Sequence, residues 1–69
     1  MTNRLRVLRA ERNWTQADLA AKVGVSRQAI HAVENGKYEP GLKLAFLIAR
    51  AFGQTVENVF IWGDGDAAR

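Results

Sequence analysis

Apolar residues recur at helical spacing through most of this 69-residue chain, and glycine or proline separates the recurring stretches. Apolar side chains three to four positions apart fall on one face of a helix. The pattern predicts helices over residues 3–12, 15–23, 27–35, 42–52 and 55–59. The apolar residues 60–62 lack that spacing and are expected to extend as a short β-strand. Short helices joined by short loops are typical of a compact bundle, so we expect an all-α fold of five helices.

Residues that start and stop helices support these boundaries. Thr15, with Asp18 three residues later, has the sequence of a capping box in which Asp replaces the usual Glu or Gln. Ser26 is a favourable N-cap for the helix that begins at residue 27. Gly24 ends the preceding helix, since glycine readily adopts the left-handed conformation found at such positions. A helix, a tight glycine turn and a second helix over residues 16–35 predict a helix-turn-helix unit.

The charge of the chain is unevenly distributed. The net charge is +3, but residues 1–50 carry nine Lys and Arg residues against four acidic residues, whereas residues 51–69 carry one against three. A basic body is typical of a protein that binds a polyanion. A basic surface with no such partner explains the charge equally well, so charge alone leaves the nucleic-acid question open.

The residue inventory argues against several function classes. The chain has no cysteine, which removes disulfides, thiolate metal ligands and a thiol nucleophile, and which fits a reducing cytoplasm. With one histidine and scattered carboxylates, we expect no enzyme activity, no metal site and no cofactor. The glycines are isolated, so no phosphate-binding loop or small-molecule ligand is predicted. The chain has no long apolar run, and neither a signal peptide nor a membrane-spanning segment is expected.

The polar face of the second motif helix carries side chains suited to the major groove of duplex DNA. Arginine bonds bidentately to guanine, and glutamine does the same to adenine. Arg27 and Gln28 occupy the first turn, which reaches base edges in a recognition helix. Ala32 is short enough to contact a thymine methyl group. His31 is assigned to the same base-contacting face, although a phosphate contact and a solvent position also remain open for it.

Phosphate contacts are expected around the two ends of this unit. Helix N-termini and polar side chains near them bind phosphate oxygens and fix the register of the protein on DNA. The predicted phosphate-contacting residues are Thr15, Gln16, Ser26, Asn35, Lys37 and Tyr38.

The segment TQADLAAKVGVSRQAIHAVENGKYEP resembles the Cro/C1-type (Xre-like) helix-turn-helix regulators of bacteria and phages, and the resemblance extends over residues 5–62. The segment ENVFIW, close to the end of the chain, is similar to the small single-domain members such as the cytolysin repressors. The resemblance implies a lambda-repressor-like domain over residues 1–62, followed by a flexible polar tail over residues 63–69. It also implies DNA contacts by Gln16, Arg27 and Gln28, and an internal ion pair between Arg9 and Glu34.

A chain of this length is near the lower limit for a self-sufficient core, which favours a homodimer. The predicted dimer interface is the C-terminal apolar group Val56, Val59, Phe60, Ile61 and Trp62. Trp62 can instead fold back onto its own bundle.

The resemblance implies a transcriptional repressor in the cytoplasm that binds a near-palindromic operator as a dimer. One alternative is the antitoxin of a toxin–antitoxin pair, with residues 60–62 and the tail binding the toxin. Another is a helical module that binds only protein, against which the basic face of the recognition helix argues.

Overall fold

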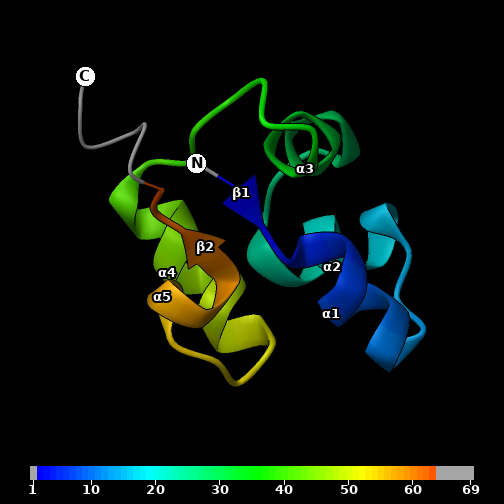
Figure 1. Ribbon diagram of the computed structural model, residues 1–69. Helices are drawn as coiled ribbons and strands as arrows, with labels where there is room; N and C mark the ends of the chain where they lie inside the picture. Colours follow the sequence, from blue (N-terminus) through cyan, green and yellow to red (C-terminus); the bar gives the residue numbers. More distant parts are fainter. Residues whose placement is uncertain (1, 64–69) are drawn as a thin grey trace.

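The structure, a computed structural model, describes residues 2–63 and contains five short helices and one small sheet (Figure 1). In chain order, the elements are β1 (Thr2–Asn3), α1 (Leu5–Arg12), α2 (Gln16–Val23), α3 (Arg27–Glu34), α4 (Leu42–Ala51), α5 (Val56–Val59) and β2 (Phe60–Ile61). The predicted five-helix order and the C-terminal strand are therefore confirmed. Except for Gly63, the predicted polar tail lies outside the described residues.

The predicted caps of the helix-turn-helix unit are present. The Asp18 N–H donates to the Thr15 hydroxyl at 3.0 Å, and the Thr15 N–H donates to the Asp18 carboxylate at 2.8 Å. Gly24 has a φ of +76°, and its N–H donates to the Ala20 carbonyl at 2.9 Å. A side chain is rarely stable at such a φ, so glycine permits the sharp turn into α3.

The start of the first helix differs from the prediction. Asn3 belongs to β1, which pairs antiparallel with β2, so that Thr2 lies opposite Ile61 and Asn3 opposite Phe60. The Asn3 carboxamide oxygen accepts the N–H of Leu5 at 3.1 Å, and α1 begins there. A strand of two residues has no periodic signal, and its pairing partner lies at the other end of the chain, which is why the sequence pattern did not indicate it.

One apolar core joins all five helices. Leu5, Leu19, Ile30, Phe52 and Val59 are among its most deeply buried members, each at 0% exposure. The remaining core residues are Leu8, Ala20, Val23, Val33, Ala45, Ile48, Ala49 and Phe60. The core therefore extends from the recognition helix to the C-terminal strand.

Trp14 closes the core below the first helix. Its ring stacks on that of Phe52 with 5.3 Å between the centroids. The Arg12 guanidinium and the Lys22 ammonium lie 5.4 and 4.6 Å from the Trp14 ring centroid. Cations over an indole face are attracted by the ring quadrupole, so these contacts stabilise the half-buried ring.

Helix α2 contacts both α3 and α4. In Figure 1, α3 lies at the upper right of the molecule, whereas α4, α5 and β2 lie at the left. Helix α3 therefore keeps an outer face that the other helices do not cover.

Candidate nucleic-acid interface

The recognition helix α3 is fixed on its inner side and exposed on its outer side. Its Ser26 cap accepts the N–H of Ala29 at 3.1 Å. Ile30 and Val33 are buried in the core at 0% and 1% exposure. Burial of these two residues fixes the orientation of the helix about its own axis. That orientation in turn determines which side chains of the helix face outward.

Arg27 and Gln28 lie on the outer face of the first turn, where both are exposed. Within residues 2–63, neither side chain forms a hydrogen bond or an ion pair with another residue. Arg27 can therefore offer the five N–H groups of its guanidinium to a partner, and Gln28 can offer the donor and the acceptor of its carboxamide. Ala32, another of the four predicted base contacts, is half-buried, so less of its surface is available to a base.

Gln16 and Thr15 lie at the N-terminus of α2. The Gln16 side-chain amide donates to Glu34 Oε1 at 3.3 Å and lies at the same distance from His31 Nδ1. The Thr15 hydroxyl accepts the cap bond from the Asp18 N–H and is exposed at the start of the helix. The positive end of the helix dipole adds to the attraction for an anion at this position.

The capping box also perturbs the acid of this turn. The hydrogen bonds from the backbone and hydroxyl of Thr15 lower the pKa of Asp18, with a smaller contribution from the charge of Lys22. Asp18 is fully exposed and stabilises the start of α2 through these bonds.

An ion pair between Arg9 and Glu34 connects α1 to α3. The Arg9 Nε donates to Glu34 Oε2 and its Nη2 donates to Oε1 at 3.0 Å, so the pair is bidentate. The Glu34 side chain is 1% exposed and that of Arg9 15%. The hydrogen bond to Glu34 raises the pKa of Arg9, although burial opposes that rise. A third bond, from Nη1 to the Trp14 carbonyl at 2.9 Å, ties the same guanidinium to the start of the helix-turn-helix unit.

The C-terminal end of α3 leads into an exposed loop. Gly36 has a φ of +73°, and the Lys37 N–H donates to the Ala32 carbonyl at 3.0 Å. Asn35, Lys37 and Tyr38 are all exposed there. These three residues and the α2 N-terminus thus flank the outer face of α3, which is the arrangement expected for phosphate contacts.

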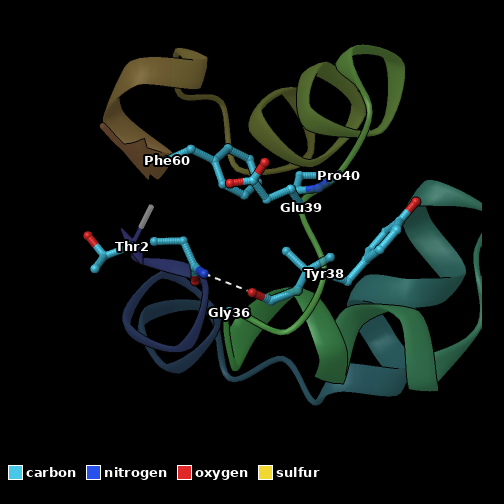
Figure 2. A pocket seen from close by; sticks show the side chains of 8 residues that line it. Thr2, Gly36, Tyr38, Glu39, Pro40 and Phe60 are labelled. Atoms are coloured by element: carbon cyan, nitrogen blue, oxygen red, sulfur yellow. Dashed lines mark hydrogen bonds between the residues drawn. The ribbon is translucent and has the colours of Figure 1, made fainter. Parts of the chain in front are cut away.

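A small cavity of about 80 Å³ lies between this loop and the terminal strands (Figure 2). Thr2, Gly36, Tyr38, Pro40 and Phe60 are among the residues that line it. The dashed bond in Figure 2 is donated by the Asn3 amide to the Val33 carbonyl at 2.9 Å. This bond attaches β1, and through it β2, to the end of the recognition helix.

The predicted dimer residues divide into two groups. Val59 and Phe60 are buried within the chain at 0% and 7% exposure, because the strand pair and α5 complete the core there. Ile61 and Trp62 are exposed at 45% and 66%, and Val56 is half-buried. Trp62 thus does not fold back into the core of its own bundle.

Three further exposed apolar residues lie on α4. Leu42 is 73% exposed, Phe46 51% and Leu47 38%. The sequence reasoning did not single them out, although apolar residues all round the helix 42–52 were a usable signal: such a helix cannot bury every side against one small core.

Residues 2–63 contain no group of three or more His, Cys, Asp or Glu side chains placed to hold a metal ion. No helix in this part of the chain has both the length and the apolar character needed to cross a membrane.

Comparison with known proteins agrees with this geometry. The Helix-turn-helix family model HTH_3 matches residues 5–58. An uncharacterised HTH-type transcriptional regulator of Methanocaldococcus jannaschii is 56% identical over 96% of this chain and 100% of its own length. The HTH-type transcriptional regulator YgzD of Bacillus subtilis is 43% identical over 87% of this chain and 91% of its own.

A solved structure has the same fold. The restriction-modification controller protein C.AhdI of Aeromonas hydrophila superposes with a TM-score of 0.76 at 30% identity, covering 83% of this chain and 86% of that protein. The capped helix pair, the exposed polar face of α3 and these similarities lead to one assignment: the chain belongs to the Cro/C1-type helix-turn-helix family of DNA-binding transcriptional regulators.

Proposed function

We propose that this regulator is a cytoplasmic repressor that binds a near-palindromic operator as a homodimer. The observation that carries the proposal is the outer face of α3, where Arg27 and Gln28 are exposed and form no side-chain hydrogen bond or ion pair within residues 2–63. Inserted in a major groove, Arg27 bonds to guanine O6 and N7, and Gln28 bonds to adenine N6 and N7. His31 and Ala32, one turn further along, lie closer to the centre of the helix.

Phosphate contacts on both sides of α3 fix its register. On one side are the N-terminus of α2 with Thr15 and Gln16, and the Ser26 hydroxyl. On the other side are Asn35, Lys37 and Tyr38, which are exposed after the end of α3. Such contacts contribute most of the salt-dependent affinity and carry little sequence information.

The dimer forms through exposed apolar residues of α4 and of residues 61–62 at the end of β2. Leu42, Phe46, Ile61 and Trp62 are exposed in the single chain. Burial of such side chains against a second copy is favourable because it removes apolar surface from water. Helix α2 contacts both α3 and α4, and the proposed interface uses the α4 side of the bundle so that both recognition helices stay uncovered.

Two-fold symmetry then gives the operator its form. A dimer with its recognition helices about 34–36 Å apart places them in successive major grooves on one side of the duplex. An operator bound in this way has two similar half-sites in opposite orientation. Where it overlaps a promoter, the bound dimer excludes the polymerase, which is repression.

The test is affinity selection from a random duplex pool at about 0.15 M salt, a concentration at which phosphate contacts alone give weak binding. Sequencing of the bound fraction is expected to yield a two-fold symmetric motif. Sedimentation of the complex is expected to show two chains bound to each duplex. An enriched motif without symmetry would refute the dimer. Binding without enrichment would refute sequence-specific regulation by Arg27 and Gln28.

A further inference from the structure

His31 lies within a chain of side-chain contacts that joins α2 to α3. The Gln16 Nε2 is 3.3 Å from His31 Nδ1 and 3.3 Å from Glu34 Oε1. On the other side of the ring, the Asn35 side-chain amide is 2.9 Å from His31 Nε2. Both ring nitrogens of this exposed histidine therefore already have partners within the protein.

Glu34 determines which hydrogens the other groups carry. Its carboxylate is paired with Arg9 and only accepts hydrogen bonds. Gln16 must therefore turn its NH₂ group, and not its oxygen, toward Glu34. The second N–H of that group faces His31 Nδ1, which must then be an unprotonated acceptor.

The tautomer of the neutral ring follows. A neutral imidazole has one donor and one acceptor, so His31 carries its hydrogen on Nε2. The Asn35 amide accepts that hydrogen through its oxygen, which a half-turn of the amide group provides. In the free protein with a neutral ring, both N–H groups of Gln16 are engaged, one by Glu34 and one by His31.

This engagement conflicts with a phosphate contact by Gln16. A phosphate oxygen only accepts, so it requires an N–H that one of the two partners must release. Glu34 stays charged opposite Arg9 and continues to accept. A protonated His31 carries a hydrogen on Nδ1, no longer accepts from Gln16, and adds a positive charge beside the DNA backbone.

We propose that His31 is a positioning residue for Gln16, and that its ring takes up a proton when the protein binds DNA. The proposal rests on the DNA-binding function proposed above. The charged groups on the elements around the ring are Glu34, whose carboxylate shares the Gln16 amide with His31, Arg9, which pairs with that carboxylate, and Arg27, four residues earlier on α3. Helix α2 contributes the uncharged Gln16. The phosphates of a bound duplex are negatively charged and attract the charged form of the ring.

Thermodynamic linkage between proton uptake and DNA binding sets the size of the expected pH effect on affinity. If a bound duplex raises the proton affinity of the ring tenfold, protonation raises the affinity for the duplex by the same factor. Histidine is the side chain whose charge ordinarily changes between pH 5 and 8. Binding to the operator is therefore expected to be up to about tenfold tighter at pH 6 than at pH 8.

The first test needs no DNA. His31 is the single histidine of the chain, so its ring nitrogens give unambiguous signals in a long-range ¹H–¹⁵N spectrum. At pH 8 the free protein is expected to show the Nε2–H tautomer. A predominant Nδ1–H tautomer would overturn the proposal whether or not the protein binds DNA.

The second test measures affinity for the selected duplex at pH 6 and pH 8 and constant ionic strength. His31→Ala is expected to remove the pH dependence, apart from a baseline from the α-amino group. Gln16→Ala, which retains the histidine, is expected to remove most of it as well. Circular dichroism establishes that both variants are folded.

Two results in this second test would overturn the mechanism. An unchanged pH dependence in His31→Ala would exclude the ring as the group that takes up the proton. An unchanged pH dependence in Gln16→Ala would mean that His31 acts by its own charge and not through Gln16. Absence of binding by all variants at both pH values would instead refute the DNA-binding proposal, and this coupling with it.

Discussion

Removal of Arg9 is expected to destabilise the protein strongly. In Arg9→Met, the Glu34 carboxylate, whose side chain is 1% exposed, keeps only the hydrogen bond from Gln16. Breaking a buried ion pair by removing one partner costs about 3–5 kcal/mol. Because the Arg9 side chain is itself 15% exposed and Gln16 remains, we expect the lower end of that range, about 3 kcal/mol.

That loss is large for a chain of this size. At about 0.05–0.15 kcal/mol per residue, its free energy of unfolding is roughly 3–10 kcal/mol. With a urea m-value of about 1 kcal/mol/M, the unfolding midpoint is expected to fall by about 3 M. Tryptophan fluorescence follows the transition, since Trp14 stacks on Phe52 in the folded protein. The measurement is made at two protein concentrations, because a dimer is stabilised by mass action.

Two comparison variants make the reasoning refutable. Arg6→Met removes the same charge from an exposed position of α1 and is expected to change stability by no more than about 0.5 kcal/mol. The double variant Arg9→Met/Glu34→Leu removes both charges and is expected to regain most of the loss. A loss below about 1 kcal/mol in Arg9→Met, or a double variant less stable than the single one, would refute the account.

Three further predictions concern DNA contact, assembly and capping. Arg27→Ala is expected to weaken binding to the selected operator by about 1–3 kcal/mol and to relax the preference at one base pair, as measured by fluorescence-anisotropy titrations. The control Arg50→Ala removes an equal charge from α4 and is expected to leave that preference intact. Equal weakening on all sequences would make Arg27 a phosphate contact. Trp62→Ala is expected to shift sedimentation equilibrium toward monomer, and an unchanged dimer would exclude the exposed indole from the interface. Thr15→Ala is expected to lower the free energy of unfolding by about 1 kcal/mol at pH 7. The pKa of Asp18 is lower in the folded protein than in the unfolded chain. The stability that the Asp18 carboxylate contributes to the cap is therefore fully present above the unfolded-state pKa, and it is lost as the pH falls through the folded-state pKa. The difference between Thr15→Ala and wild type should therefore shrink on acidification in urea titrations, and a constant difference would contradict this.

Local sequence patterns predicted the helices well because each helix has its own start and stop residues. Thr15 and Ser26 accept cap bonds from residues three positions ahead, and Gly24 takes the left-handed turn. These interactions are formed within a few residues, so they are visible in a sequence. The motif spacing in turn places Arg27 and Gln28 on one exposed face.

Features that depend on distant residues were not predictable in the same way. Strand β1 exists because Thr2 and Asn3 meet β2 at the opposite end of the chain. For the same reason the sequence did not divide the C-terminal apolar group into buried residues, such as Phe60, and exposed ones, such as Trp62. The contact between Gln16 and His31 depends on how α2 crosses α3, and no local pattern encodes the distance between their side chains.

Glu34 connects the stability of the fold to its DNA-facing surface. It accepts hydrogen bonds from Arg9 of α1 and from Gln16 of α2, while its own helix carries the recognition face. The double variant Arg9→Met/Glu34→Leu therefore separates two roles. It is expected to unfold near the wild-type urea concentration, yet Gln16 loses the acceptor that orients its amide. Ordering a free side chain on binding costs about 0.5–1.5 kcal/mol, so operator affinity should fall by up to about tenfold. Wild-type affinity in a stable double variant would show that the ion pair serves the fold alone.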